Sequence, residues 1–197
     1  SFSLSNQHEA IVSASIGITL YPNDGDSVEG LLKNADTATY QAKESGRNTV
    51  RFFTNDMNKA VMERMQIERE LRKAVSRHEL CLHYQPVVSL TTGKVVGAEA
   101  LVRWQHPTQG LIYPDKFIGI AEETGLIEPM GEWILQQALT DLKRWHKLGY
   151  RLHVAVNVSS RQCKKNSHEP ISKVIKRALV ANQLEPHYLK VSLNIKK

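Results

Sequence analysis

Long apolar runs, cysteines and a basic N-terminal segment are scarce or absent in this sequence. No stretch of its 197 residues approaches 18 consecutive apolar residues, so the sequence predicts no membrane-spanning segment. The first nine residues have neither the basic start nor the apolar centre of a signal peptide. Its two cysteines, Cys81 and Cys163, are too far apart to match a metal-binding spacing. We therefore expect a cytoplasmic protein with reduced thiols.

Internal repeats and low-complexity segments are also absent. The chain is 41% hydrophobic and 23% charged, which is ordinary for a folded globular protein. This composition excludes disorder as the default state and allows a sizeable hydrophobic core.

Positive charge is concentrated toward the end of the chain. Residues 141–197 contain 13 Lys and Arg against 3 Asp and Glu, a balance of +10 within a total of +6. The preceding 140 residues therefore carry −4. A basic region can attract phosphate-bearing partners, or it can be the solvated face of a helix. No nucleic-acid-binding motif accompanies these basic residues, so we expect no nucleic-acid partner.

Residues 10–53 follow a strand, helix, strand pattern. Residues 10–20 alternate small and β-branched side chains, and the apolar positions from Val28 to Ala42 have helical spacing, with Gly46 suited to the C-cap. Residues 48–53 form a short strand pattern. About 53 residues would make only a marginal core, so this segment is expected to be the end of an α/β-type domain.

A helix predicted over residues 55–76 connects this segment to a second unit. There, strands are predicted at 80–88 and 95–104, joined by a short turn that makes them antiparallel. Helices are predicted at 114–125, 127–148 and 170–181, and strands at 151–159 and 188–195. Strands that alternate with helices favour a parallel α/β architecture, either an open sheet or a barrel.

Glu99 is the most unusual residue of this second unit, because it is a carboxylate inside an apolar, strand-like run. A buried carboxylate needs a partner, such as a metal or a basic group. Glu99 and Arg103 alternate onto one strand face, and Asn157 lies at the carboxyl end of a later strand, where α/β folds collect ligand sites. A carboxylate and an amide oxygen suit Mg²⁺ or Mn²⁺, and Arg103 suits a phosphate. The alternatives are a Glu–Arg pair for Glu99 and a turn contact for Asn157, and Gln85 by itself indicates little.

Several separated motifs from residue 75 to 195 resemble an EAL domain, in the right order and at plausible spacing. They are Tyr84-Gln85-Pro86-Val87-Val88, Gly97-Ala98-Glu99-Ala100-Leu101-Val102-Arg103-Trp104, His106-Pro107, Gly110-Leu111-Ile112-Tyr113-Pro114, Phe117-Ile118, Ala121-Glu122-Glu123-Thr124-Gly125-Leu126-Ile127, Trp133-Ile134-Leu135 and Val156-Asn157-Val158-Ser159-Ser160-Arg161-Gln162. The resemblance implies a TIM-like barrel with one antiparallel strand. It also implies hydrolysis of cyclic di-GMP to pGpG with Mg²⁺ or Mn²⁺.

The first part of the chain resembles the end of a GGDEF domain, the diguanylate cyclase fold. The matching stretches are Ser13-Ala14-Ser15-Ile16-Gly17-Ile18, Leu31 to Lys43, and Gly46-Arg47-Asn48. We therefore expect residues 1–54 to be the end of an α+β GGDEF domain, 55–76 a connecting helix and 77–197 a partial EAL barrel. By this resemblance Lys43 and Arg47 would approach a GTP phosphate, and the alternative is a solvated helix end. The sequence contains no Gly-Gly-Asp-Glu-Phe motif, so we expect no diguanylate cyclase activity.

By the EAL resemblance, Glu99 and Asn157 are metal ligands, and Gln85 and Arg103 contact the cyclic dinucleotide. The family's next strand usually reads Leu-Glu-Leu-Glu-Ile-Thr-Glu and donates a metal-binding Glu. Here Ser192 and Ile195 stand at the positions of its second and third Glu. The paired aspartates and the later lysine and glutamate of the family do not occur.

We therefore expect a chain from a cyclic di-GMP phosphodiesterase class that is inactive alone and binds metal weakly. The alternatives are a non-catalytic module that binds cyclic di-GMP or another GGDEF–EAL protomer, and an inert truncated remnant.

Overall fold

A computed structural model of the chain describes residues 2–4, 8–10, 12–163 and 169–194. Its contacts divide the chain into two compact units, Ser1–Gln66 and Ile67–Lys197. The helix α2 (Asn55–Ala74) contributes its first turns to the first unit and its last turns to the second.

The first unit contains two small sheets. Strands β1 (Phe2–Leu4) and β2 (His8–Ala10) pair antiparallel, and β3 (Ile16–Ile18) pairs parallel with β4 (Val50–Phe52). Helix α1 (Val28–Glu44) joins β3 to β4, and Ser27 caps it by accepting a hydrogen bond from the Gly30 amide at 3.2 Å. The predicted strand–helix–strand order is therefore confirmed.

The predicted strand over residues 10–20 is wrong in its extent. Within that stretch and among the described residues, only Ile16–Ile18 pairs with β4, and His8–Ala10 belongs to a separate hairpin. The strand ends early because the Leu20 amide donates to the Asp24 carboxylate at 2.7 Å, and the Asp24 amide donates back to the Leu20 carbonyl at 2.8 Å. The Leu20 backbone is thus held in a turn.

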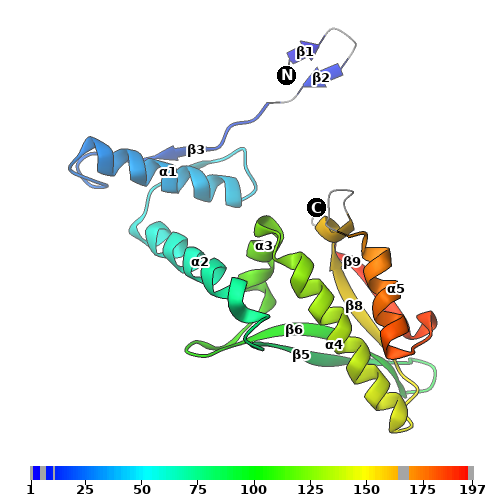
Figure 1. Cartoon of the computed structure of the whole chain (residues 1–197). Coiled ribbons are helices and arrows are strands. Elements are labelled where there is room, and N and C mark those ends of the chain that lie inside the picture. Colours follow the sequence, from blue (N-terminus) through cyan, green and yellow to red (C-terminus); the bar gives the residue numbers. More distant parts are fainter. Residues whose placement is uncertain (1, 5–7, 11, 164–168, 195–197) are drawn as a thin grey trace. The chain divides into compact units, whose positions relative to one another are not determined.

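The second unit is built on a sheet with the order β5-β6-β8-β9, in which β7 also pairs with β6 (Figure 1). Strand β5 (Leu80–Val88) is antiparallel to β6 (Val95–His106), whereas β8 (His153–Ser159) and β9 (Leu189–Asn194) continue the sheet in parallel. The short strand β7 (Gly110–Ile112), absent from the sequence prediction, pairs antiparallel with the end of β6.

Three helices of the second unit match their predicted ranges within one or two residues: α3 (Pro114–Thr124), α4 (Ile127–Lys147) and α5 (Ile171–Asn182). Gly125 ends α3 in a left-handed conformation with φ 81°, which a glycine adopts without strain. Two short 3-10 turns, η1 (Ser160–Cys163) and η2 (Pro186–Tyr188), complete the unit. The last residue of the predicted final strand, Ile195, lies outside the described residues.

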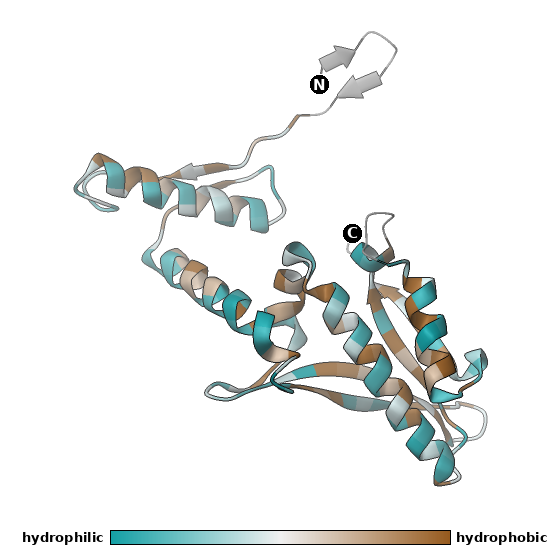
Figure 2. Cartoon of the chain, viewed as in Figure 1, coloured by the Kyte–Doolittle hydropathy of each residue, from teal (hydrophilic) through white to brown (hydrophobic). Residues whose placement is uncertain are grey.

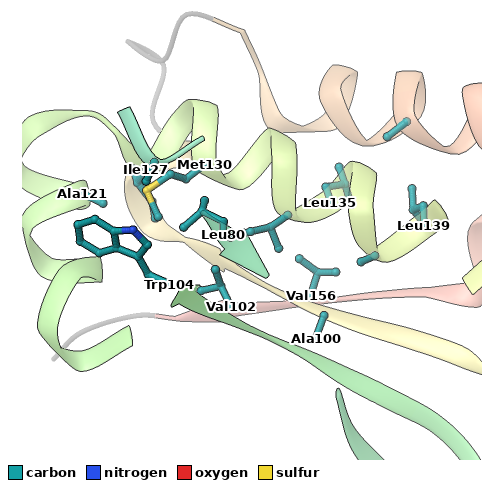
Figure 3. Packing of buried hydrophobic residues seen from close by; sticks show 14 of the residues in the cluster. Leu80, Ala100, Val102, Trp104, Ala121, Ile127, Met130, Leu135, Leu139 and Val156 are labelled. Carbon is teal, nitrogen blue, oxygen red and sulfur yellow. The ribbon is translucent and has the colours of Figure 1, made fainter. Parts of the chain in front are cut away.

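The core of the second unit lies between α4 and one face of the sheet (Figure 3). Trp104 is fully buried there, and its indole N–H donates to the Glu79 carboxylate at 3.0 Å, so its polar atom is satisfied. Tyr84 of β5 donates to Asp141 of α4 at 2.8 Å, which ties the helix to the same face. Figure 2 colours α4 in both brown and teal, as expected for an amphipathic helix that covers a sheet. Among the described residues, no helix is both long enough and apolar enough to cross a membrane.

Candidate functional site

Strand β6 presents two chemically different faces. Ala98, Ala100 and Val102 are buried in the core, and the alternate residues Glu99 and Arg103 are half-buried on the opposite side. Successive side chains of a strand point to opposite faces, so the apolar neighbours of Glu99 do not enclose it. The expectation of a fully buried carboxylate is therefore corrected. We call this second side the open face, and define it by Gln85, Glu99, Arg103, Asn157 and Ser192.

Three of the expected site residues lie together on the open face. Gln85 of β5 is directly opposite Glu99 in the antiparallel register. From the next strand, the Asn157 Nδ2 group donates a 2.6 Å hydrogen bond to the Glu99 Oε1 atom. Asn157 can hold this position because β8 is parallel to β6, with Ala155 opposite Glu99 and Asn157 two residues further on.

Glu99 has an amide partner rather than an arginine partner. Along a strand, residues 99 and 103 are separated by about 13 Å, at roughly 3.3 Å per residue. No ion pair joins Glu99 to a basic group within the described part of the chain. The alternative interpretation of Glu99, a Glu–Arg pair, is therefore not found in the described part of the structure.

The guanidinium of Arg103 is surrounded by neutral groups. Its Nη1 group donates to the Val102 carbonyl at 2.8 Å, and its Cζ atom lies 5.0 Å from the centre of the Tyr113 ring. Its Nε group is buried and has no hydrogen-bond partner among the described residues. Cys81 is opposite Arg103 on β5; burial raises the pKa of the Cys81 thiol, and the positive charge of Arg103 opposes part of this shift.

Ser192 of β9 is directly opposite Asn157 and is exposed. It therefore lies next to the Glu99–Asn157 pair, at the position where the resemblance expects a carboxylate. Lys190 is opposite Ala155 in the adjacent row, which adds a positive charge to this part of the open face. In the part of the chain that the structure describes, no group of three or more His, Cys, Asp or Glu residues could hold a metal.

The oxygen atoms available to a cation are therefore few but of the right kind. With Asn157 Nδ2 bonded to Glu99 Oε1, the Asn157 Oδ1 and Glu99 Oε2 atoms have no hydrogen-bond partner among the described residues. Carboxylate and amide oxygens suit Mg²⁺, which commonly takes one or two protein ligands and completes its shell with water and phosphate oxygens. The donor set thus fits a weakly held Mg²⁺ or Mn²⁺ ion.

A polar network fixes the turn that follows β8. The Ser159 hydroxyl donates to Glu122 of α3 at 2.9 Å, and the Ser159 amide donates to the Gln162 carbonyl oxygen at 3.0 Å. Gln162 is itself buried against Gly131 of α4, where an added Cβ would overlap its Nε2 atom. These residues, together with Asn157, line a cavity of about 120 Å³ at the carboxyl end of β8.

This network was not among the residues expected from the sequence. Glu122, Ser159 and Gln162 do occur in the quoted motifs, but no spacing rule distinguishes a buried polar network from surface polarity. Tyr113 also occurs in a quoted motif, but no role in the site is predicted for it from the sequence.

Lys43 and Arg47 lie at the other end of the chain from this site, in the first unit. Lys43 is in the last turn of α1, Arg47 follows the helix with φ 61°, and both are exposed. A helix C-terminus favours cations by its dipole, so this location favours the helix-end interpretation over a phosphate site.

The class of fold is an α/β sheet in which β5 and β7 are antiparallel to β6, while β6, β8 and β9 are parallel and end at a polar site. A family model for the EAL domain matches residues 68–196, and a model for the diguanylate cyclase GGDEF domain matches residues 2–49. The chain belongs to the EAL family, with the end of a GGDEF domain before it. EAL domains form TIM-like barrels, of which this chain covers a part.

Two similar proteins have names that state cyclic di-GMP activities. The chain is 43% identical over 185 residues to the "Bifunctional diguanylate cyclase/cyclic di-GMP phosphodiesterase MucR" of Pseudomonas aeruginosa, covering 93% of this chain and 27% of that protein. It is 49% identical over 148 residues to the "Cyclic di-GMP phosphodiesterase NbdA" of the same organism, covering 75% of this chain and 19% of that protein. The chain thus spans about a quarter or less of the length of these relatives.

Solved structures agree with this assignment. The MucR phosphodiesterase in complex with c-di-GMP superposes with a TM-score of 0.60 and 40% identity, over 64% of this chain and 50% of that chain. The EAL enzyme Bd1971, in its form bound to cAMP and cyclic-di-GMP, gives a TM-score of 0.61 and 25% identity, over 86% of this chain and 44% of that chain.

Proposed function

We propose that this chain acts in cyclic di-GMP signalling and that its open face binds cyclic di-GMP together with Mg²⁺ or Mn²⁺. The contact between Asn157 Nδ2 and Glu99 Oε1 carries this proposal, because it holds two oxygen-bearing side chains from different strands together. The names of MucR, NbdA and the solved c-di-GMP complex support the choice of ligand. We also propose residues 1–54, 55–76 and 77–197 as the GGDEF part, the connecting helix and the EAL part.

Each site residue has a distinct role in this proposal. Glu99 and Asn157 would hold the metal ion, Arg103 would neutralise a phosphate, and Gln85 would donate hydrogen bonds to the ligand from the strand opposite Glu99. A metal held there would lower the pKa of a bound water molecule. In a site with its full set of carboxylates, hydrolysis would join the water oxygen to phosphorus and release a ribose oxygen, which would take up a proton, to give linear pGpG.

Turnover by this chain alone is not expected. A two-metal site needs several carboxylates to offset its charge, whereas Ser192 offers a hydroxyl next to Asn157. We therefore propose that the 197-residue chain binds cyclic di-GMP weakly and does not hydrolyse it. We also propose that the first unit adds no cyclase activity, since the 197 residues contain no Gly-Gly-Asp-Glu-Phe motif. A second protomer remains a proposed partner.

Calorimetry and product analysis on the same sample test this proposal. We expect heat of cyclic di-GMP binding in Mn²⁺ and no pGpG by chromatography. Binding with turnover would contradict the inactive assignment and support the complete phosphodiesterase function. An absence of binding would contradict the proposed ligand and support an inert remnant.

A further inference from the structure

Arg103 is a charged residue without a charged partner in the described part of the chain. Its recorded contacts are the Val102 carbonyl and the Tyr113 ring, and Cys81 opposite it is held toward the neutral thiol by burial. A half-buried guanidinium without a carboxylate is poorly compensated. This arrangement suits a site whose counter-charge arrives with an anionic ligand.

Tyr113 is exposed although it is aromatic. It lies between β7 and α3, immediately before Pro114, and 55% of its surface is accessible. Within the described part of the chain its hydroxyl makes no hydrogen bond, and its ring contacts Arg103. Neither core packing nor a polar network therefore explains why a tyrosine stands here.

The Arg103 Cζ atom lies over the Tyr113 ring, 5.0 Å from its centre, so the ring contacts the guanidinium with its face. A planar guanidinium stacks on an aromatic face, so its in-plane donors stay directed outward. In Arg103 the Nη1 group is partly used by the Val102 carbonyl, and the Nε group is shut off from water. The Nη2 group has no hydrogen-bond partner among the residues that the structure describes, which leaves this end of the guanidinium for a phosphate oxygen.

We propose that Tyr113 is a positioning residue that orients Arg103 toward a phosphate of the bound cyclic dinucleotide. This inference rests on the proposed function. The aromatic ring, and not the hydroxyl, does the orienting. A tyrosine-to-phenylalanine change therefore preserves the effect, and an aliphatic side chain of similar size loses it.

The test is calorimetric titration of the full 197-residue chain with cyclic di-GMP in Mn²⁺. We expect Tyr113→Leu to weaken binding about 3- to 30-fold, the range of a cation–π contact. Tyr113→Phe should bind within about twofold of the unchanged chain, on the same principle. Tyr150→Leu is the matched control, because Tyr150 is also exposed, at 62%, and precedes the amino end of β8, whereas Asn157 lies near the carboxyl end of that strand.

Repeating the test in an Arg103→Lys variant shows whether Tyr113 orients Arg103 or contacts the ligand itself. Arg103→Lys keeps the charge but has no plane to stack, so adding Tyr113→Leu to it should weaken binding less than twofold. The NMR signals of the Arg103 side chain give a ligand-free readout, because loss of the ring current in Tyr113→Leu should shift them, whereas Tyr113→Phe should not.

The outcomes are distinguishable. Equal affinities of the unchanged chain and Tyr113→Leu for cyclic di-GMP would overturn the role of Tyr113 and leave the proposed function standing. Arg103 chemical shifts that are the same in both proteins would have the same consequence. If Tyr113→Leu weakens cyclic di-GMP binding just as much in the Arg103→Lys background, Tyr113 contacts the ligand directly and does not act by positioning Arg103. Failure of the unchanged chain to bind would overturn the proposed function, and with it the ligand role of Tyr113.

Discussion

Asn157 on β8 donates a 2.6 Å hydrogen bond to Glu99 on β6, which joins two side chains that are 58 positions apart in the chain. The parallel register of the two strands makes this contact possible, because it sets Ala155 opposite Glu99 and Asn157 two residues beyond. The contact holds the proposed metal ligands together before a metal binds.

Replacing the amide at this contact tests whether it is a cation site. In Asn157→Asp two carboxylates would face each other where a hydrogen bond now exists. We expect a loss of about 1 to 2 kcal/mol of stability in EDTA from charge repulsion. This corresponds to a decrease in melting temperature of about 2 to 8 °C. Mn²⁺ should restore more stability to the variant than it adds to the unchanged chain. A melting temperature of Asn157→Asp that does not respond to Mn²⁺ would exclude a metal at this position.

A carboxylate at position 192 should strengthen the site. Ser192 is opposite Asn157, so the side chain in Ser192→Glu would add a charged oxygen ligand on the open face. We expect Mn²⁺ to bind roughly tenfold more tightly, since affinity follows the number of charged ligands. Calorimetric titration with Mn²⁺ measures this change. Ser192→Gln is the control for size, and equal affinities in the Glu and Gln variants would argue against a metal beside Asn157.

The buried network behind the site predicts a stability effect at Gly131. An alanine there would place its Cβ on Gln162, which is buried and accepts the Ser159 amide hydrogen bond. We expect Gly131→Ala to cost about 1 to 3 kcal/mol through overpacking, read from urea denaturation. Adding Gln162→Ala should recover part of this loss, because it removes the overlapping amide. Additive losses in the double variant would mean that the two side chains do not compete for the same space.

His153, at the amino end of β8, should make the stability of the fold depend on pH. Burial, and then the positive charge of Lys190, lower the pKa of His153 below its ordinary value of 6.5. Below pH 6.5 the unfolded chain therefore binds this proton more readily than the folded chain does. The contribution of His153 to stability is complete above pH 6.5 and is lost as the pH falls toward the lowered pKa.

We expect His153→Gln to flatten the stability curve in this window, measured by denaturation at several pH values. His83→Gln, a change at an exposed histidine of the same sheet, is the control. If the free energy of unfolding depends on pH in the same way in His153→Gln and in the unchanged chain, the pH dependence belongs to other groups.

Much of the second unit could be predicted from local patterns, because strand alternation and helical spacing are set by neighbouring residues. Strand β5 was predicted at its observed bounds, and α3 to within one residue. The three residues of β7 gave no periodic signal, since their strand character comes from pairing with β6. Alternation also predicted that Glu99 and Arg103 share a face.

The remaining features of the site depend on how strands meet in space. The contact of Asn157 with Glu99 requires the parallel register of β6 and β8, which no local pattern encodes. Likewise, Tyr113 reaches Arg103 because β7 turns the chain back beside β6. The sequence motifs predicted the candidate site residues, whereas the pairing of strands determines which of them touch.

The most direct measurement is the affinity of the 197-residue chain for cyclic di-GMP in Mn²⁺ and in EDTA, compared between Glu99→Gln and Glu63→Gln. Glu63 is exposed on α2, so its variant removes the same charge away from the open face. We expect Mn²⁺ to strengthen binding to the unchanged chain and to Glu63→Gln, and to have no effect on Glu99→Gln. Equal responses of all three proteins to Mn²⁺, or no binding by any of them, would contradict a metal-assisted cyclic dinucleotide site at Glu99.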